Sequence, residues 1–284
     1  MTADPIDPVN LDASTVQSAL LELAVAAGEA ILRIYDSARH DGVRGASARL
    51  DDKSDHSPLT RADLAANDIL CQGLRRLTPD IAVVSEEDNS STRQEDPGTF
   101  WLIDPLDGTK EFLAFNGDFT VNIALIVGGK PYFGVVYAPV LHAMYWGGLR
   151  FGAFRQTNAL IEPIRVASPR PSGSVQRIIA SRSHLNQQTS SLISRFPKVE
   201  IVQAGSSLKF CRVAEGAADI YPRLGPTCEW DTAAGQAVLE GAGGFVFDAA
   251  GFPLSYGKAD VLNPHFIAAS ARRVGGELLN ALMK

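Results

Sequence analysis

The sequence predicts an α+β fold with an antiparallel sheet in its first half and an α/β fold with a mixed sheet in its second half. In residues 99–154, short apolar runs with alternating side chains follow one another through tight turns, which is typical of an antiparallel sheet. After residue 176, strand-like and helix-like segments alternate, which favours an α/β layer. A proline-containing stretch separates the two patterns. We therefore predict an N-terminal α+β domain over residues 1–160 and a C-terminal α/β domain over residues 161–284.

The composition is that of a globular protein with a substantial core. The chain has 284 residues, of which 45% are hydrophobic, and a net charge of −6 that excludes a basic track for nucleic acid. Cys71, Cys211 and Cys228 lack metal-ligand or redox spacing, so we expect unpaired thiols in a reducing compartment. No signal-peptide pattern or membrane-length apolar run is recognisable, so we expect a cytoplasmic protein. Peripheral membrane attachment and the choice between monomer and homodimer stay open.

The first elements in the chain are helical. Apolar residues at spacings of three and four predict a helix over 14–35, followed by a polar loop over 36–58. Thr60 and Asp63 form a pattern like a capping box, which predicts that a second helix begins there and ends at Thr78. A short strand over 81–84 then leads to Glu86.

The stretch from Phe100 to Thr109 carries the strongest chemical signal. Four apolar residues predict a buried strand, which Pro105 should end directly after Asp104. Asp107 and Gly108 predict a tight turn at this strand end, where the two carboxylates can converge. Like charges held that close repel each other unless a cation lies between them, and magnesium prefers such oxygen ligands. An ordinary surface turn is the alternative reading of the same residues.

The remaining elements follow from alternation and turn signals. Residues 119–127 alternate between apolar and polar and predict a half-buried strand, and Gly128-Gly129 predicts a hairpin turn. Further strands of the first half are expected at 132–137, 143–146 and 152–154. In the second half we expect strands at 177–180, 200–203, 218–221, 244–247 and 266–269, and helices at 206–215, 231–240 and 271–282.

Each candidate acid also has a purely structural reading. Glu86 could be a solvated residue after a strand, Asp231 could cap the helix that follows it, and Asp63 could do no more than close its capping box. Spacing in the sequence does not show that they meet.

Two motifs in the same chain resemble those of the magnesium-dependent, lithium-sensitive phosphomonoesterases of the inositol monophosphatase superfamily. The first is Asp-Pro-Leu-Asp-Gly-Thr at 104–109, and the second is Trp-Asp-Thr-Ala-Ala-Gly at 230–235. The Lys-Glu pair after Thr109 and the Gly-Ser-Ser-Leu-Lys block at 205–209 are similar to the branch of 3'(2'),5'-bisphosphate nucleotidases of the CysQ type. The resemblance runs from about residue 14 to the C-terminus and implies a layered α-β-α-β-α sandwich.

The resemblance also implies a metal site. Glu86, Asp104, Asp107 and the carbonyl of Leu106 would hold two magnesium ions, and Asp231 would complete the second site. Glu86 and Thr109 would position and deprotonate a metal-activated water. By similarity, Asp63 would help to hold water around a third, weaker magnesium ion.

By the same resemblance, the substrate would be bound by both halves. Asp107, Asp231 and the backbone N–H groups of Gly108 and Thr109 would face the reacting phosphate. Four residues of the second half would contact the adenosine and its remaining phosphate: His184, Ser206, Lys209 and Arg223. Each of these also has a structural alternative, and Lys53 is a further candidate near the metals.

The expected activity is removal of the 3'-phosphate from 3'-phosphoadenosine 5'-phosphate, and from its 5'-phosphosulfate relative, to leave AMP and phosphate in the first case. Hydrolysis of inositol 1-phosphate or of sugar phosphates in general is the alternative enzyme reading. A regulatory protein that kept the fold without turnover is a third, which the complete acidic set disfavours.

Overall fold

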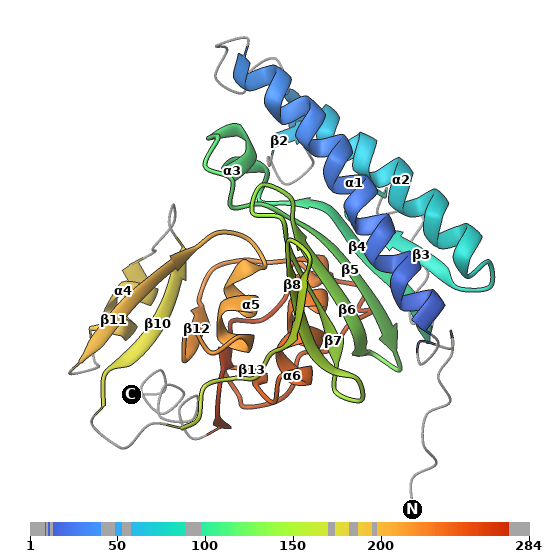
Figure 1. Cartoon of the computed structure of the whole chain (residues 1–284). Coiled ribbons are helices and arrows are strands. Elements are labelled where there is room, and N and C mark those ends of the chain that lie inside the picture. The colour runs from blue at the N-terminus through green and yellow to red at the C-terminus, as the bar shows by residue number, and fades with distance from the viewer. Residues whose placement is uncertain are drawn as a thin grey trace, which may run out of the picture.

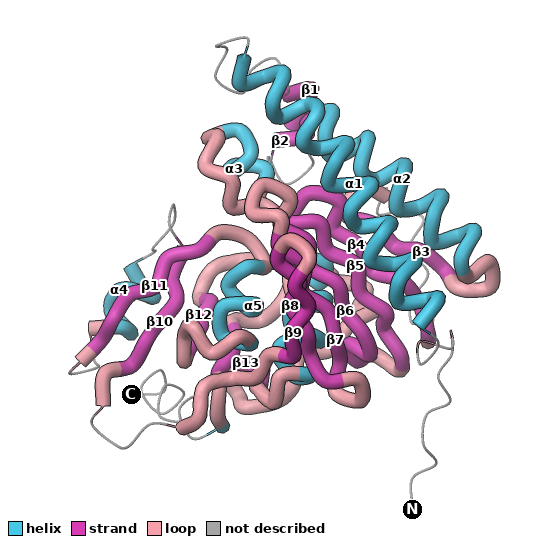
Figure 2. Tube along the Cα trace, in the orientation of Figure 1, coloured by secondary structure: helices cyan, strands magenta, loops and turns pink. Residues whose placement is uncertain are grey.

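The protein folds into alternating layers of helices and sheets. The computed structural model describes residues 9, 11, 14–40, 49–52, 58–88, 98–169, 174–181, 187–194 and 198–272. The layers are α1 with α2, a seven-stranded sheet, α5 with α6, a five-stranded sheet, and α4 (Figures 1 and 2). The predicted α-β-α-β-α sandwich is confirmed.

The helices and the strands have the following bounds. The helical elements are α1 (Ser14–His40), α2 (Arg61–Leu77), α3 (Thr109–Leu113), α4 (Gln187–Ile193), α5 (Leu208–Ala214), η2 (Glu229–Asp231) and α6 (Ala233–Gly241). The strands are β1 (Arg49–Asp52), β2 (Pro58–Thr60), β3 (Ala82–Ser85), β4 (Thr99–Asp107), β5 (Thr120–Val127), β6 (Lys130–Ala138), β7 (Ala143–Gly148), β8 (Gly152–Thr157), β9 (Leu160–Pro163), β10 (Gln176–Ser181), β11 (Val199–Ala204), β12 (Ile220–Arg223), β13 (Phe245–Asp248) and β14 (Phe266–Ala269).

Besides a two-stranded sheet of β1 and β2, the described residues form a first, seven-stranded sheet and a second, five-stranded sheet. The first sheet has the order β3-β4-β5-β6-β7-β8-β9 and is antiparallel from β4 onward, while β3 lies parallel to β4. The second sheet has the order β11-β10-β12-β14-β13 and mixes parallel and antiparallel pairs, as predicted.

Alternating side chains on one strand fill two different cores. On β4, Trp101 and Ile103 point into a core shared with α1 and α2, whereas Phe100 and Leu102 point into a core shared with α5 and α6. That second core also contains Phe210 of α5, so it joins the two halves of the chain. The proposed division at residue 160 remains a prediction; in the structure, β9 still pairs with the first sheet up to Pro163.

Helix α1 is unusually long and apolar. By length and composition, Thr15–His40 could cross a membrane, and it is the one helix among the described residues of which this is true. Leu20, Ala24, Ala27 and Ile31 are nevertheless fully buried against the rest of the first core, which is the pattern of a core helix in a folded domain.

Several boundaries differ from the sequence prediction. Helix α1 continues to His40, and the expected loop over 36–58 contains β1 and β2. Helix α4 was not expected. The helix expected at 231–240 is a 3₁₀ turn, η2, followed by α6, and the helix expected at 271–282 lies almost entirely outside the described residues.

Strand β4 also passes through Pro105 instead of ending at Asp104. The ladder between β4 and β5 is irregular between Asp104 and Asp107, and β3 pairs with β4 only as far as Ile103. Pro105, which has no N–H group, therefore lies in a bulge beyond the last residue of β4 that pairs with β3, and a strand tolerates proline at such a position. The bulge aims both aspartates at the same end of the sheet.

Candidate active site

The β4 bulge fixes the first two acidic side chains. The backbone N–H group of Leu106 donates a hydrogen bond of 3.0 Å to Asp104 Oδ1, and Asp104 is 1% exposed. Gly108 follows with φ +95°, and a Cβ atom there would lie 3.3 Å from the carbonyl oxygen of Asp118 and from Cα of Phe119. Only glycine adopts this backbone conformation without strain. The predicted turn is thus confirmed, and it leads directly into α3.

Glu86 reaches the site because β3 lies parallel to β4. Ser85 is paired with Ile103, and the backbone N–H group of Glu86 donates to the Ile103 carbonyl at 3.1 Å. Residues that follow paired parallel strands meet at the same sheet edge, so Glu86 stands beside Asp104.

Asp231 comes from the other half of the chain. It ends η2, and its Oδ2 atom accepts a hydrogen bond of 2.8 Å from the backbone N–H group of Cys228. This bond closes the 3₁₀ turn η2 that precedes α6. The N-cap residue of α6 is Thr232, so Asp231 does not cap that helix. Cys228, which is not in a disulfide, lies on the wall of the site.

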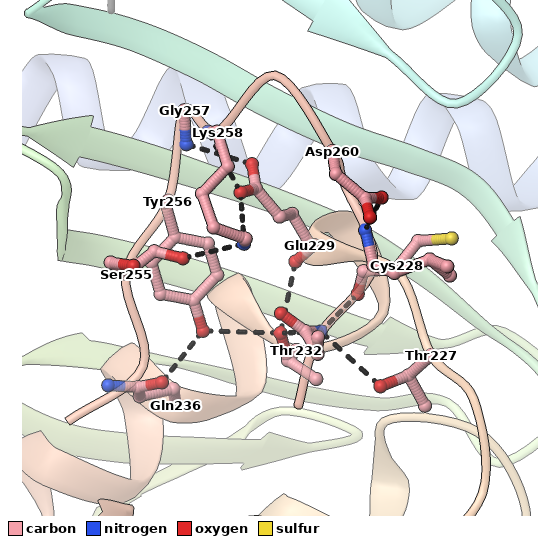
Figure 3. A network of polar contacts seen from close by, with 12 residues as sticks. Thr227, Cys228, Glu229, Thr232, Gln236, Ser255, Tyr256, Gly257, Lys258 and Asp260 are labelled. Carbon is pink, nitrogen blue, oxygen red and sulfur yellow. Dashed lines mark hydrogen bonds and ion pairs between the residues drawn. The ribbon is translucent and has the colours of Figure 1, made fainter. Parts of the chain in front are cut away.

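A clasp of residues 255–263 holds the Asp231 segment in place. Figure 3 shows how it gathers around Glu229 and Thr232. Glu229 is 2% exposed and accepts from the backbone N–H groups of Gly257 and Lys258 at 2.8 and 3.1 Å, and its carboxylate forms an ion pair with the Lys258 ammonium. The side chain of Asn263 donates to the Cys228 carbonyl at 2.6 Å.

The predicted convergence of acids from both halves is present in the structure. Carboxylate oxygens of Asp104, Asp107 and Asp231 all lie within 4.8 Å of one another. They line a cavity of ≈ 230 Å³ together with Glu86, Leu106, Gly108, Thr109, Lys110, Glu111, Cys228 and Trp230.

The electrostatics of this cluster are those of a site built for cations. Burial raises the pKa of Asp104 well above its usual value, and the Glu86, Asp107 and Asp231 carboxylates raise it further. Burial likewise raises the pKa of Asp231, and so do Asp107 and Glu86. Crowded buried carboxylates of this kind are stable as anions only beside a positive charge. Their oxygens are the donor type that hard divalent cations take.

Thr109 and Asp63 face each other at the same site. Asp63 is fully buried, and its Oδ2 atom accepts from the backbone N–H group of Thr60 at 2.9 Å, which confirms the capping box of α2. Its Oδ1 atom lies 3.5 Å from the hydroxyl of Thr109, and the carbonyl oxygen of Leu106 lies 3.4 Å from that hydroxyl. Asp63 therefore serves both as a cap and as an acceptor for a site hydroxyl.

The Gly-Ser-Ser block brings the second half against Asp107. Ser206 has φ +51°, a left-handed conformation that is uncommon outside glycine and that often marks functional sites. Its hydroxyl donates to the Asp107 carbonyl at 2.7 Å and lies 2.9 Å from the Thr120 hydroxyl. Ser207 donates to the Asp107 carboxylate through both its backbone N–H group and its hydroxyl, each at 2.7 Å. Ser207 and its partner Asn122 were not among the predicted site residues.

The observation that identifies Asn122 is the burial of both faces of β5, which alternation did not predict. Residues 120–126 are all buried, because α5 and α6 cover the face that we expected to meet solvent. On that face, Asn122 and Thr120 contact Ser207 and Ser206. A polar position on a strand covered on both faces needs a partner.

Lys209 and Arg223 lie behind the acidic cluster. Lys209 is 6% exposed, and its ammonium lies 5.5 Å from the centre of the Tyr221 ring. Burial lowers the pKa of Lys209 to about 8, although the Asp107, Glu111 and Asp231 carboxylates partly oppose this and Arg223 adds to it. The Nε atom of Arg223 is buried without a hydrogen-bond partner. His184 and Lys53 lie outside the described residues.

Comparison with known proteins gives one consistent result. The family model described as "Inositol monophosphatase family" matches residues 12–283. A protein of Escherichia coli O157:H7 named 3'(2'),5'-bisphosphate nucleotidase CysQ is 45% identical over 247 residues, which cover 86% of this chain and 96% of that protein.

Solved structures agree with the sequence comparison. The crystal structure of CysQ from Bacteroides thetaiotaomicron matches with a TM-score of 0.78 and 38% identity, covering 93% of this chain and 100% of that one. The suhB protein of Bartonella henselae matches with a TM-score of 0.76 and 26% identity, covering 95% and 99%.

Proposed function

The chain belongs to the inositol monophosphatase family, and we propose from its site that it is a 3'(2'),5'-bisphosphate nucleotidase. The substrate would be 3'-phosphoadenosine 5'-phosphate, whose 3'-phosphate is released to leave AMP; the 5'-phosphosulfate relative is a second candidate. The observation that carries the proposal is the meeting of Asp104, Asp107 and Asp231 carboxylates within 4.8 Å. The choice of substrate is supported by the 45% identity to a protein with that name.

We propose magnesium as the cofactor, with two ions in the main site and a third, weaker one near Asp63. Glu86, Asp104, Asp107, Asp231 and the Leu106 carbonyl would hold the main pair. The fit rests on the donor set, since these are crowded carboxylate oxygens and burial together with mutual repulsion raises the pKa of Asp104 and Asp231. A divalent cation would relieve that repulsion. When bound, magnesium would neutralise phosphate charge and acidify water.

The chain's own residues then orient the attack. The Thr109 hydroxyl can donate to Asp63 Oδ1 at 3.5 Å, which leaves its oxygen free to accept a hydrogen from the attacking water. Asp63 and Glu86 are the two carboxylates that can take the proton. The backbone N–H groups of Gly108 and Thr109, at the wall of the same cavity, would hold the phosphate oxygens in line for attack.

The second phosphate would be recognised by the second half of the chain. Lys209 is a buried cation close to the acidic cluster, and Arg223 presents a guanidinium with an unsatisfied buried Nε atom. A phosphate would satisfy both groups through charge-assisted hydrogen bonds. The hydroxyl of Ser206 is held by the Asp107 carbonyl and the Thr120 hydroxyl. It would contact the substrate while keeping this position. His184 is the expected adenosine contact from the sequence.

We propose that the enzyme works in the cytoplasm.

The test is phosphate release with saturating magnesium over a panel of substrates. The panel contains 3'-phosphoadenosine 5'-phosphate, its phosphosulfate relative, inositol 1-phosphate and a sugar phosphate, each with and without lithium. We expect kcat/KM for the bisphosphate to exceed that for inositol 1-phosphate by at least about tenfold, because each charge-assisted contact is worth about 1.5–3 kcal/mol. Equal or better turnover of inositol 1-phosphate would contradict the proposal.

A further inference from the structure

We propose that Ser207 and Asn122 are positioning residues that fix the Asp107 carboxylate for its cation and tie it to the Asp231 segment. The inference rests on the proposed function, since it concerns the metal site of that reaction. Neither residue is itself proposed as a metal ligand or a substrate contact.

All three hydrogen bonds that the structure gives the Asp107 carboxylate fall on one oxygen. Oδ2 accepts from the backbone N–H group of Ser207 at 2.7 Å, from the Ser207 hydroxyl at 2.7 Å and from Asn122 Nδ2 at 3.2 Å. An oxygen held by three donors has little freedom to rotate, so the carboxylate has one fixed orientation. Oδ1, to which the described residues donate none of these bonds, is the oxygen that would be left for a cation.

Ser207 also connects the two halves of the site. Its hydroxyl lies 2.9 Å from the carbonyl oxygen of Asp231 and accepts from Asn122 Nδ2 at 2.9 Å. Since the hydroxyl has a single hydrogen, that hydrogen serves either the Asp107 carboxylate or the Asp231 carbonyl at a given moment. The hydroxyl therefore bonds either to β4 or to η2, while its oxygen accepts from Asn122 of β5 in both arrangements. The backbone N–H group of Ser207 keeps its bond to the Asp107 carboxylate in both.

Burial explains why these contacts can control the geometry. Ser207 and Asn122 are each 1% exposed, so water does not compete for their hydrogen bonds. The left-handed conformation of Ser206 directs the N–H group of Ser207 toward Asp107. The preceding residue must be glycine for this turn to pack closely, because a Cβ atom at Gly205 would lie 2.5 Å from the Asp118 carbonyl oxygen. The strain in this turn is therefore stored where it positions a carboxylate.

The experiment measures Mn²⁺ binding to the substrate-free protein by electron paramagnetic resonance. The variants are Ser207→Ala, which keeps the backbone donor but removes the hydroxyl, Asn122→Ala, which removes the amide, and Ser207→Thr, which keeps a hydroxyl. Partners of metal ligands typically contribute 10- to 100-fold to metal affinity. We expect Ser207→Ala and Asn122→Ala each to weaken Mn²⁺ binding by about tenfold, and Ser207→Thr to retain most of the affinity.

The matched control is Ser270→Ala, which changes another buried serine. Ser270 follows β14, and Arg223 lies at the opposite end of the paired strands β12 and β14. We expect it to bind Mn²⁺ as the parent does. Affinities within twofold of the parent in both Ser207→Ala and Asn122→Ala would overturn the inference, and so would an equal loss in Ser270→Ala. If Ser207→Ala does not fold, Asn122→Ala decides alone. Because no substrate is present, failure of the proposed function would show only in the substrate panel with the parent enzyme.

Discussion

We propose that Lys209 is a buried side chain that selects the bisphosphate substrate. It is 6% exposed, beside the Tyr221 ring, and its charge is felt by Asp107, Glu111, Asp231 and Arg223. Burial makes the charged form costly, so the pKa of Lys209 falls to about 8. A bound phosphate dianion would stabilise the charged form of Lys209, whereas a neutral sugar hydroxyl would not.

The lowered pKa of Lys209 gives a pH dependence with a definite sign. Below pH 8 the ammonium is charged and attracts the second phosphate, and above pH 8 it loses its proton, so affinity falls as pH rises through about 8. We expect KM for 3'-phosphoadenosine 5'-phosphate to rise between pH 7 and 9 in the parent. In Lys209→Met, KM should be high throughout and show no step. Steady-state kinetics on both proteins checks this, with inositol 1-phosphate as the control substrate, and a parallel step in the variant would exclude Lys209 as the source.

Thr109 permits a test of the hydrolytic step that leaves the carboxylates intact. Thr109→Val keeps the shape of the side chain and removes the hydroxyl that faces Asp63. We expect kcat to fall by about 100- to 10,000-fold, the range for loss of a positioned proton-transfer group. Mn²⁺ affinity should stay close to that of the parent. A normal kcat in this variant would show that another group orients the water.

At the residue scale, the sequence predicted the role of a residue where that residue belongs to a recognisable local motif. The capping box predicted both Thr60 and Asp63, and the two motifs predicted the acids that meet in the structure. Ser207 and Asn122 could not be predicted in this way. Their importance depends on a contact between residues 85 positions apart, and alternation alone assigned Asn122 to solvent.

At the scale of elements, the differences between prediction and structure cluster at the site. Pro105 ends a regular strand but not one that carries a bulge, so β4 extends to Asp107. The helix expected from residue 231 begins instead as a 3₁₀ turn, because Asp231 uses its carboxylate to close that turn onto the Cys228 N–H group. Away from the site, the hairpin at Gly128-Gly129 and the strand β14 agree with the prediction.

The clasp over 255–263 can be tested as an element that stabilises the Asp231 segment. Glu229→Gln weakens two backbone hydrogen bonds and removes the ion pair with Lys258. We expect the free energy of unfolding to fall by about 1–3 kcal/mol, the usual cost of losing a buried hydrogen-bonded charge partner. Urea unfolding measures this.

Lys258→Met provides the comparison for the clasp, since it removes the cation and keeps the backbone N–H group that reaches Glu229. It should lower the free energy of unfolding by at least as much as Glu229→Gln does, because it leaves the buried Glu229 carboxylate charged and without its ion-pair partner. If Glu229→Gln unfolds at the same urea concentration as the parent, the clasp does not stabilise the fold.

At the scale of the whole molecule, the site exists because the two halves share a core. Phe100 and Leu102 of β4 pack in the same core as Phe210 of α5, which sets the distance between the Asp107 turn and the Ser207 turn. Arg155 of β8 and Arg212 of α5 both bind the buried Glu215, at 2.8 and 2.6 Å, and so add a polar tie between the halves. The acids of β4 and η2 are therefore held together by packing that does not depend on the cation.

The helices and strands were predictable because alternation and periodicity are local signals, whereas the layered sandwich was implied by the resemblance to a family. How the layers stack, and hence which polar faces meet, depends on contacts across the halves that one sequence does not reveal. The resemblance to a family supplied that information for Asp231, which spacing alone left undecided.

The central claim is that acids from both halves of the chain hold one set of divalent cations. Anomalous diffraction from crystals grown with Mn²⁺ tests it most directly. We expect Mn²⁺ in the cavity, bound by the Asp104, Asp107 and Asp231 carboxylates together. A cavity without Mn²⁺ at saturating concentration, or an ion that Asp231 does not contact, would contradict the account.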